Sequence, residues 1–321
     1  MKKRRLKKSA KIILIAVPTL ILFITIITMY LIRINTLSYK LHEVGYDKEE
    51  IEIIQEKLDE KTQKSLLDRP YNQSIPLLVK EPYFLQKNLE SYLTYLKDHA
   101  KMKKEEVVGI VNVHADKDFY TDAIQSDTSL GDAVLVNKYY YLTQDYDSGN
   151  IEDISAQYAY DGNSIRDYVY DAFIELWEAG QKEGYTFIIN SSYRPYEDQE
   201  EIYESYKDSY GTDYADSYAA RPGFSEHQTG LALDIISYPV DYEDFEDTKA
   251  YQWLIKHAHE YGFILRYPEG KEKLTGYHFE SWHYRYLGKE LATKVYESGL
   301  TYDEYYAFYL DKKVDNEETS H

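Results

Sequence analysis

An uncharged apolar run near the N-terminus constrains this chain more than any other feature. The 21 residues from Ile12 to Ile32 contain no Asp, Glu, Lys or Arg. At about 1.5 Å of rise per residue, a helix of this length spans the roughly 30 Å hydrocarbon core of a membrane. Pro18 lies within the run, and transmembrane helices tolerate proline better than soluble helices do. The run therefore predicts a single transmembrane helix.

The charges around this run predict its orientation. Residues 1–33 contain eight Lys and Arg and no acidic residue, and seven of the eight precede the run. By the positive-inside rule, residues 1–11 lie in the cytoplasm and the chain from about residue 34 onward lies outside. A cleaved signal peptide is the competing interpretation, but it has a shorter apolar core and a small-x-small cleavage site. Residues 28–33 read Thr-Met-Tyr-Leu-Ile-Arg, which favours an uncleaved anchor formed by residues 12–32.

The composition of the rest of the chain excludes several classes of protein. Residues 34–321 hold 29 basic and 56 acidic residues, a net charge of -27. This argues against nucleic acid as a partner, because phosphate neutralisation needs a basic surface. The chain has no cysteine, so disulfides, zinc fingers, iron–sulfur clusters and thiol nucleophiles are excluded, and a metal must be held by histidines and carboxylates. A cysteine-free exported protein is typical of bacterial, especially Gram-positive, cell surfaces.

The sequence beyond the anchor divides into a helical part and a mixed part. Apolar residues at helical spacing predict helices over 47–69 and, after Pro82, over 85–96. Short β-like runs follow at Val107–Val113 and Ala133–Tyr140. The expected parts of the chain are a basic tail and anchor (1–33), a helical membrane-proximal region (34–104), an α+β domain (105–310) and a charged tail (311–321).

Helices and strands alternate after residue 160. Ser164 is expected to cap a helix that ends at Gly184, and Pro195 to begin a helix that runs through Tyr206. The other predicted elements are the strands Tyr185–Asn190, Leu231–Ile236 and Tyr277–Tyr286 and the helices Thr248–Tyr261, Lys289–Glu297 and Tyr302–Leu310. The predicted fold class is α+β, with a small antiparallel sheet and flanking helices.

Tyrosine is abundant, with 37 residues spread along the chain. Its side chain combines an apolar ring with a polar hydroxyl group, so the simplest interpretation is packing in the core and on the surface. Some of the rings could stack on sugars, but the sequence does not select which ones.

Two short segments combine histidines with acidic residues. Asp234 is a lone carboxylate in the apolar stretch 231–236, and His227 precedes it. A charge buried in such a strand must be paired or bound to a metal. Glu280 and His283 lie in another predicted strand. Two histidines and one aspartate would make a catalytic zinc set with an open fourth position and leave Glu280 as the base. The spacing alone equally allows Asp234 to pair with an arginine and both histidines to be ordinary core residues.

Three ordered blocks resemble the signature segments of the D-alanyl-D-alanine carboxypeptidase family, which includes VanY-type and LdcB-type enzymes of bacterial cell walls. The blocks are Ser191–Gln199 (SSYRPYEDQ), Ser225–Asp234 (SEHQTGLALD) and Glu280–Tyr286 (ESWHYRY). The upstream segment Leu135–Tyr139 is similar to one that often precedes the catalytic core in that family. The resemblance covers roughly residues 105–300.

The resemblance implies a role for each matching residue. These are the zinc ligands His227, Asp234 and His283, the general base and acid Glu280, the oxygen-binding residue Arg194, and the substrate-binding residues Gln199 and Ser225. A guanidinium group suits a developing oxyanion because it is a permanently charged, forked donor. Ser281 departs from the family pattern, which often has proline there, and this could loosen the turn that brings Glu280 and His283 together.

The sequence therefore predicts an anchored zinc metallopeptidase that removes a C-terminal D-alanine from peptidoglycan stem peptides. The motif residues serve D,D- and L,D-carboxypeptidases alike, and no pattern defines an oligomeric state. The alternative is a wall-binding or regulatory module that keeps the fold and the zinc without turnover. The retention of Glu280 favours an enzyme. The least specific interpretation is an anchored α+β domain without a metal.

Overall fold

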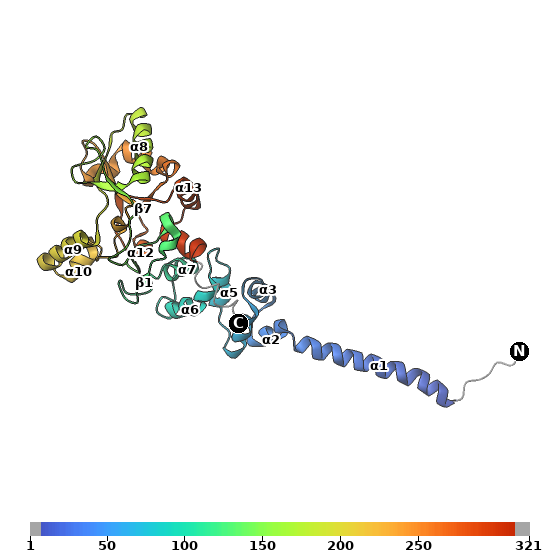
Figure 1. Ribbon diagram of the computed structural model, residues 1–321. Coiled ribbons are helices and arrows are strands. Elements are labelled where there is room, and N and C mark those ends of the chain that lie inside the picture. The colour runs from blue at the N-terminus through green and yellow to red at the C-terminus, as the bar shows by residue number, and fades with distance from the viewer. Residues whose placement is uncertain (1–7, 312–321) are drawn as a thin grey trace. The chain divides into compact units, whose positions relative to one another are not determined.

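A computed structural model describes residues 8–311 and divides the chain into two compact units, residues 1–108 and 109–321. Figure 1 labels the main elements of both units. Residues 1–7 of the predicted basic tail and residues 312–321 of the predicted charged tail lie outside the described part of the chain.

The first unit is helical and begins with one long apolar helix. Within the described residues, this helix is the one that is long and apolar enough to cross a membrane, with a mean hydropathy of 2.1 over Ala16–Ile34. A helix of this kind near an N-terminus serves as an anchor or as a signal sequence. The elements are α1 (Lys8–Ile34), α2 (Leu37–Val44), α3 (Lys48–Lys57), α4 (Glu60–Ser65), η1 (Leu66–Asp68), α5 (Ser74–Val79), η2 (Gln86–Asn88) and α6 (Leu89–Asp98). The next helix, α7 (Lys104–Asn112), contains the boundary between the two units.

The prediction of one helix over 47–69 is wrong, because the chain breaks within it. Leu58 leaves the helical conformation, with φ -106° and ψ 144°. Asp59 then starts α4, and its side chain accepts a hydrogen bond of 2.6 Å from the backbone N–H of Thr62. Aspartate is a strong N-cap, so it favours a new helix start over continuation. The apolar stripe itself is buried, since Ile51, Ile54 and Leu58 pack in one cluster.

The second unit is a mixed α and β structure. Its elements are β1 (Ile124–Gln125), η3 (Thr128–Ala133), β2 (Tyr140–Tyr141), β3 (Ile151–Asp153), β4 (Ser164–Arg166), α8 (Asp167–Lys182), β5 (Phe187–Ser191), α9 (Tyr196–Tyr210), α10 (Thr212–Tyr218), η4 (Glu226–Thr229), β6 (Ala232–Ser237), η5 (Tyr242–Asp247), α11 (Lys249–His257), η6 (Ala258–Tyr261), β7 (Phe263–Tyr267), α12 (Glu272–Thr275), β8 (Glu280–Tyr286), α13 (Lys289–Ser298), α14 (Tyr302–Tyr305) and the π-helical turn η7 (Tyr306–Leu310).

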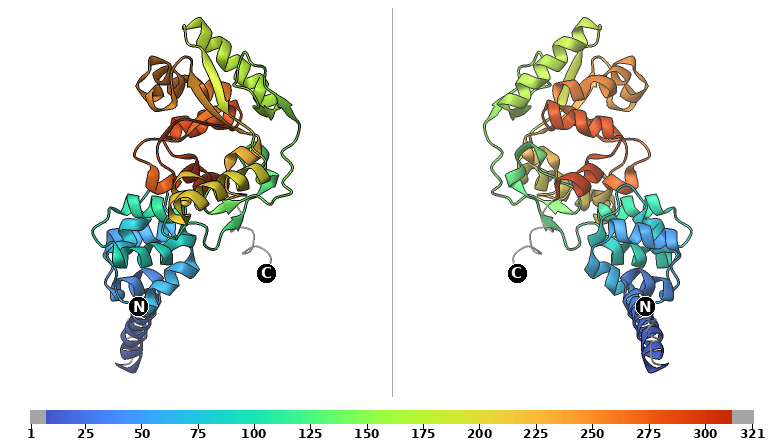
Figure 2. Two further views of the ribbon diagram at one scale, coloured as in Figure 1. Left: turned by 90° about the vertical axis from the view of Figure 1, so that its left-hand side faces the viewer. Right: turned by 90° about the vertical axis from the view of Figure 1, so that its right-hand side faces the viewer.

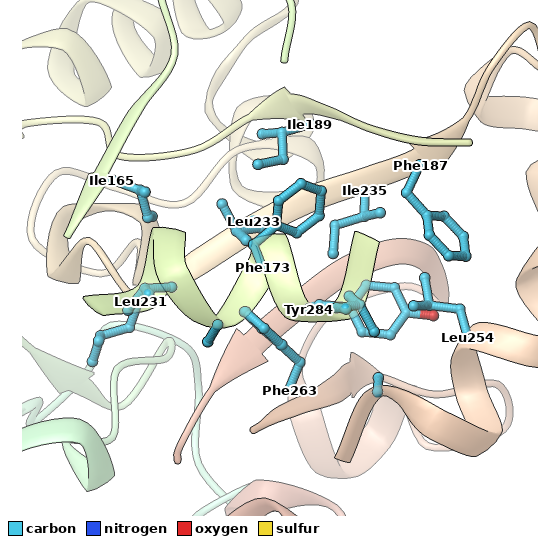
Figure 3. Close-up of a cluster of buried hydrophobic side chains, with 14 of the residues drawn as sticks. Ile165, Phe173, Phe187, Ile189, Leu231, Leu233, Ile235, Leu254, Phe263 and Tyr284 are labelled. Carbon is cyan, nitrogen blue, oxygen red and sulfur yellow. The ribbon is translucent and has the colours of Figure 1, made fainter. Parts of the chain in front are cut away.

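A four-stranded antiparallel sheet is the centre of this unit. Its strand order is β5-β6-β8-β7. Figure 2 shows α8 lying along one face of the sheet. In Figure 3, Phe173 of α8 extends toward Ile189 of β5 and toward Leu233 and Ile235 of β6. Truncation of a buried phenylalanine costs about 3–5 kcal/mol, so this contact layer fixes the sheet against the helix.

The α+β class and the small antiparallel sheet are confirmed, and so are the predicted strands at 185–190, 231–236 and 277–286. The helix predicted from Pro195 is α9, and the helix predicted over 248–261 is α11 followed by the 3-10 helix η6. The two C-terminal helices predicted over 289–297 and 302–310 are α13 and the pair α14 and η7.

The β-like runs Val107–Val113 and Ala133–Tyr140 are not the strands that the sequence predicted. The first lies almost entirely in α7, where Val107, Val108 and Val111 are buried at helical spacing. In the second, only Tyr140 belongs to a strand. The backbone groups of this run bond partly to loop backbone and partly to side chains, and Arg285 donates to the carbonyl oxygen of Val134 at 2.7 Å. Burial of an apolar run therefore does not require a sheet.

The helix start predicted at Ser164 is also wrong. Ser164 lies in β4, which pairs antiparallel with β3, and α8 begins only at Asp167. The apolar face predicted for this helix is confirmed, since Val169, Phe173 and Leu176 are completely buried.

Candidate metal centre and catalytic cleft

The ladder between β6 and β8 brings two of the predicted ligands side by side. Asp234 on β6 pairs in register with His283 on β8. Side chains alternate between the two faces of a strand. Leu233 and Ile235 therefore join the core under α8, while Asp234 and His283 point to the opposite face. This alternation explains why one carboxylate interrupts an apolar strand.

His227 reaches the same place from the 3-10 helix η4, which ends at Gly230. Gly230 has φ 66°, and a Cβ atom there would lie 2.9 Å from Cδ1 of Ile151. The left-handed backbone favours glycine here, and a Cβ atom would displace the end of the Ile151 side chain. The turn leads the chain directly into β6, and this is why His227 and Asp234 converge.

The three predicted ligands form one compact cluster. Each offers a ligand atom within 4.8 Å of the other two. Nε2 of His227 lies 3.6 Å from Oδ1 of Asp234, and Nδ1 of His283 lies 3.2 Å from the same oxygen. All three residues are buried. The arrangement has the donor types and the spacing of a site for a single metal ion.

The outer nitrogen of each imidazole is already engaged. Nδ1 of His227 lies 2.6 Å from the carbonyl oxygen of Ser192, so Nδ1 donates and Nε2 faces the cluster. Nε2 of His283 lies 3.4 Å from Oε2 of Glu226, which leaves Nδ1 facing Asp234. Metal-binding histidines typically use one nitrogen for the metal and the other for a carbonyl or carboxylate group. Both rings are therefore oriented as a metal site requires.

The charges of the cluster fit a cation. Oδ1 of Asp234 is buried and lacks a hydrogen-bond partner of good geometry within residues 8–311. Burial lowers the pKa of His227 to about 4, so its imidazole is neutral and able to coordinate. Burial alone would also lower the pKa of His283, yet the carboxylates of Asp234, Glu226 and Glu280 raise it to about 10. Acidic groups that hold a proton on a buried imidazole provide the negative charge that a divalent metal needs.

Glu280 lies at the start of β8, next to the cluster. Its Oε2 is 3.5 Å from Nδ1 of His283, and its side chain keeps 27% exposure. Burial raises the pKa of Glu280 to about 7. A carboxyl group with a pKa near neutrality can accept and return a proton at physiological pH. Ser281 is buried beside it, and the serine at this position leaves Glu280 and His283 in contact.

Arg194 follows β5 and is held by two hydrogen bonds. It donates to Oε1 of Gln199 at 2.8 Å and to Oγ of Ser191 at 2.9 Å. Gln199 is 1% exposed, and its Nε2 donates to the carbonyl oxygen of Ala220 at 2.7 Å. Both ends of the Gln199 amide are thus engaged within the protein, and this residue orients Arg194.

A cleft of about 850 Å³ contains all of these groups. Its lining includes every predicted site residue: Arg194, Gln199, Ser225, His227, Asp234, Glu280 and His283. Aromatic side chains form much of the remaining wall: Tyr206, Tyr218, Tyr242, Tyr267, Tyr277, Phe279 and Trp282. A cleft of this volume, with a few polar groups converging at its base, is typical of a site for a small or peptide ligand.

Comparison with known proteins gives the family. The model of the VanY family, D-alanyl-D-alanine carboxypeptidase, matches residues 162–289. The protein YodJ of Bacillus subtilis (strain 168) is 36% identical over 179 residues, which cover 54% of this chain and 66% of YodJ. A D-alanyl-D-alanine carboxypeptidase of Enterococcus faecalis (strain ATCC 700802 / V583) is 34% identical over 190 residues, covering 56% of this chain and 68% of that protein. The chain belongs to the VanY family.

A solved structure supports the same assignment to the VanY family. The LdcB LD-carboxypeptidase, whose structure reveals how that protein recognises peptidoglycan, has 34% sequence identity and a TM-score of 0.55. The match covers 59% of this chain and 91% of LdcB. The VanY-family chain spans about two thirds of the length of YodJ and of the Enterococcus faecalis relative.

This VanY-family chain also contains a buried ion-pair network that the sequence patterns did not reveal. Oε1 of Glu226 accepts hydrogen bonds of 2.8 Å from both Arg266 and Arg285. Arg266 also pairs with Asp303, and Asn137 donates to Asp303 at 2.8 Å. Glu226 immediately precedes His227 in the sequence, and its position next to a predicted metal ligand is the sequence feature that could have indicated its role. Through its second oxygen Glu226 contacts His283, so the network holds one of the three candidate metal ligands in place.

Proposed function

We propose that this protein is a zinc metallopeptidase that removes a C-terminal D-alanine from peptidoglycan stem peptides. The observation that carries the proposal is the meeting of His227, Asp234 and His283 in one cleft, with Glu280 in contact with His283. Two nitrogens and one carboxylate oxygen are ligands that zinc prefers, and three protein ligands leave a position open for catalysis. Membership of the VanY family supports the reaction class.

In this proposal each side chain has a separate task. When bound, zinc is a Lewis acid that activates water and polarises a carbonyl group. Glu280 removes the proton from the attacking water and passes it to the leaving amine, since a carboxyl group with a pKa of about 7 can do both. Arg194 donates to an oxygen of the substrate, and Gln199 keeps its guanidinium group in place. Ser225, which is buried and lines the cleft, contacts the substrate peptide.

We further propose that α1 is an uncleaved anchor in the cell membrane, with the catalytic cleft on the outer side. The length and hydropathy of Ala16–Ile34 support a membrane span. The basic residues before the helix support a cytoplasmic N-terminus. On the outer side the cleft has access to the wall polymer. Relatives from Bacillus and Enterococcus support a Gram-positive host.

The test measures zinc and peptidase activity on the full chain purified in detergent. Zinc content is measured by elemental analysis, and D-alanine release from synthetic tetrapeptide and pentapeptide stems is followed by mass spectrometry. The two substrates distinguish L,D- from D,D-cleavage, because the relatives include both a D-alanyl-D-alanine and an LD-carboxypeptidase. We expect about one zinc per chain, as a cluster with one set of three ligands requires.

Glu280→Gln is the decisive variant, because it keeps the size of the side chain and removes the proton acceptor. We expect it to retain zinc and to lose about a thousandfold in the rate of D-alanine release. Glu290→Gln, which changes a surface glutamate paired with Lys294, is the matched control and should keep the parent rate. If Glu280→Gln cuts as fast as the parent, the role of Glu280 is wrong. If the parent binds zinc but cuts neither stem, the chain is a wall-binding module and the peptidase proposal fails.

A further inference from the structure

Four tyrosines form a continuous aromatic strip on the helical hairpin of α9 and α10. These helices lie side by side (Figures 1 and 2). Tyr206 and Tyr210 are one turn apart on α9, and Tyr214 and Tyr218 are one turn apart on α10. Ring centroids lie 4.6 Å apart for Tyr210 and Tyr214, 4.4 Å for Tyr214 and Tyr218, and 6.3 Å for Tyr206 and Tyr214. These four residues form the tyrosine strip.

The tyrosine strip is exposed although its rings are ordered against one another. Tyr210 and Tyr218, at the two ends of the stack, are 65% and 64% exposed. None of the four hydroxyl groups has a hydrogen-bond partner within residues 8–311. A contiguous apolar patch that is exposed to water is energetically unfavourable, and such patches commonly mark binding sites. The rings pack against one another, so a ligand that stacks on them would order fewer independent side chains.

Other residues hold the hairpin together. Tyr203 is buried, and its hydroxyl group donates to Oδ1 of Asp216 at 2.8 Å. Arg221 donates to both oxygens of Asp216, at 2.9 and 2.8 Å. Ala215 of α10 is fully buried. The tyrosine strip is therefore not needed to join α9 to α10, and its position calls for another explanation.

The tyrosine strip continues the wall of the catalytic cleft. Tyr206 and Tyr218 line the cleft, whereas Tyr210 and Tyr214 lie beyond it. His278, which also lines the cleft, lies 6.3 Å from Tyr218 between ring centroids. A ligand that occupies the cleft and extends past its edge along α10 would meet the tyrosine strip next.

The negative charge around the tyrosine strip restricts the kinds of ligand that could bind there. Residues 196–218 contain eight Asp and Glu and a single basic residue, Lys207. An acidic hairpin repels polyanions such as phosphate-containing polymers and anionic lipid surfaces. Sugar rings are uncharged where they present C–H groups to an aromatic face, and their hydroxyl and amide groups can bond with tyrosine hydroxyls. A neutral polysaccharide fits both the rings and the charge.

We propose that the tyrosine strip binds the amino-sugar chain to which the stem peptides of the wall polymer are attached. This inference rests on the proposed function, because it takes the ligand of the cleft to be a stem peptide. The peptide occupies the cleft while its sugar chain lies along α10 and α9. The protein then discriminates between a stem peptide on the polymer and the same peptide free in solution.

The first experiment measures binding without catalysis. Full chain in mild detergent is mixed with peptide-free wall glycan immobilised on beads, in which the carboxylates exposed by removal of the peptides have been capped as neutral methyl amides, and the bound protein is measured. The test variant is Tyr210→Ser/Tyr214→Ser, since these two residues do not line the cleft. We expect it to bind the glycan about tenfold more weakly, equal to about 1.4 kcal/mol. Tyr210→Phe/Tyr214→Phe, which keeps the rings, should retain most of the affinity.

Tyr160→Ser is the matched control, because Tyr160 is 46% exposed in the same unit and belongs neither to the hairpin nor to the cleft lining. It should bind glycan as the parent does. All variants are checked by tryptophan fluorescence, since Trp177, Trp253 and Trp282 all lie in the second unit. An unchanged melting transition shows that the substituted hairpin has not unfolded the domain.

The second experiment measures kcat and KM on stem peptides that are free or attached to glycan. The double serine variant should raise KM about tenfold for attached peptides only. If the parent binds glycan through the tyrosine strip but cuts neither substrate, the peptidase proposal fails and the glycan proposal stands. If parent and double variant bind glycan equally, the glycan proposal is wrong. It is also wrong if the substitution instead abolishes binding to anionic vesicles or self-association, measured by light scattering, while glycan binding is unaltered.

Discussion

The floor and the rim of the cleft are built in opposite ways. The floor consists of Asp234 and His283 on the sheet and of Glu226 and His227 on η4, all buried and all engaged in polar contacts. The rim is the hairpin of α9 and α10, where apolar rings are exposed and charges face solvent. A buried polar floor tolerates little change, because each group is the partner of another. Substitutions in the floor should therefore lower metal affinity and the free energy of unfolding, whereas substitutions in the rim should change which substrates are bound.

The largest effect is expected from His227→Ala, which removes a floor ligand. A metal that stabilises charge in the transition state contributes several kcal/mol, so D-alanine release should fall by at least about a thousandfold. Zinc content should fall in parallel under dialysis against a weak chelator. His259→Ala is the matched control, because His259 stacks on Tyr296 away from the cleft. Retention of full zinc content by His227→Ala would remove His227 from the ligand set.

A smaller effect is expected from Glu226→Gln, which neutralises a buried carboxylate of the floor. Burial opposes ionisation of Glu226, but Arg266 and Arg285 hold its pKa below the usual range. Removal of that charge leaves two buried arginines with less negative charge to balance them, so we expect a loss of about 3 kcal/mol in the free energy of unfolding. Zinc affinity should weaken about tenfold, as is typical when the partner of a ligating histidine is lost.

Urea unfolding followed by tryptophan fluorescence measures this loss, because all three tryptophans report on the second unit. A chelator competition measures the zinc affinity. Glu290→Gln serves again as the surface control and should change the free energy of unfolding by less than about 0.5 kcal/mol. Equal effects of the two substitutions would contradict the contrast between a coupled floor and an independent surface.

The smallest effect is expected at Lys138, which lies beneath the rim. Its Nζ donates to the carbonyl oxygen of Asp216 at 2.9 Å and lies 4.3 Å from the centroid of the Phe119 ring. Burial lowers the pKa of Lys138 to about 8, whereas the unfolded chain has a value near 10.4. Between these values the unfolded state binds more protons, so stability rises with pH across this window. Below about pH 8 both states are protonated, and the cost of the buried charge is constant.

Lys138→Met should abolish this rise. From pH 7 to pH 10 the parent should gain about 2 kcal/mol in the free energy of unfolding relative to the variant. Urea unfolding at the two pH values measures the difference, with exposed Lys256→Met as a control for which the difference should stay constant. Parallel pH profiles of the parent and Lys138→Met would show that the buried ammonium group carries no such cost.

The sequence predicted the fold best where local patterns and long-range packing agree. The strand that contains Asp234 and the helix with Phe173 on its inner face both follow from periodicity and are present. The prediction of a strand over Val107–Val113 was wrong because valine favours strands, whereas here the valine side chains are buried on a helix. Asp59 divides one predicted helix in two by capping the second part, and its carboxylate accepts hydrogen bonds from Thr62 and from Gln86, a contact that the local pattern does not show.

The candidate site was predictable only in part, and for a physical reason. Spacing alone left the pairing of Asp234 open, and only the resemblance of three blocks selected the residues that the structure brings together. Glu226 was missed because its partners Arg266 and Arg285 are far away in the sequence, as is Asp303, which pairs with Arg266. The tyrosine strip was hidden for a similar reason, since it requires the turn between α9 and α10 to bring two helical faces into line.

The pairing of Asp234 with His283 across β6 and β8 has one more consequence. A slip of a single residue between these strands would set Trp282 or Tyr284 opposite Asp234 and turn the imidazole of His283 to the other face of the sheet. No partial site would survive such an error, because the two donors would then lie on opposite sides of the backbone. The cluster of candidate ligands therefore forms only in chains in which β6 and β8 are paired in this register, so metal binding would report on the correct pairing of the sheet.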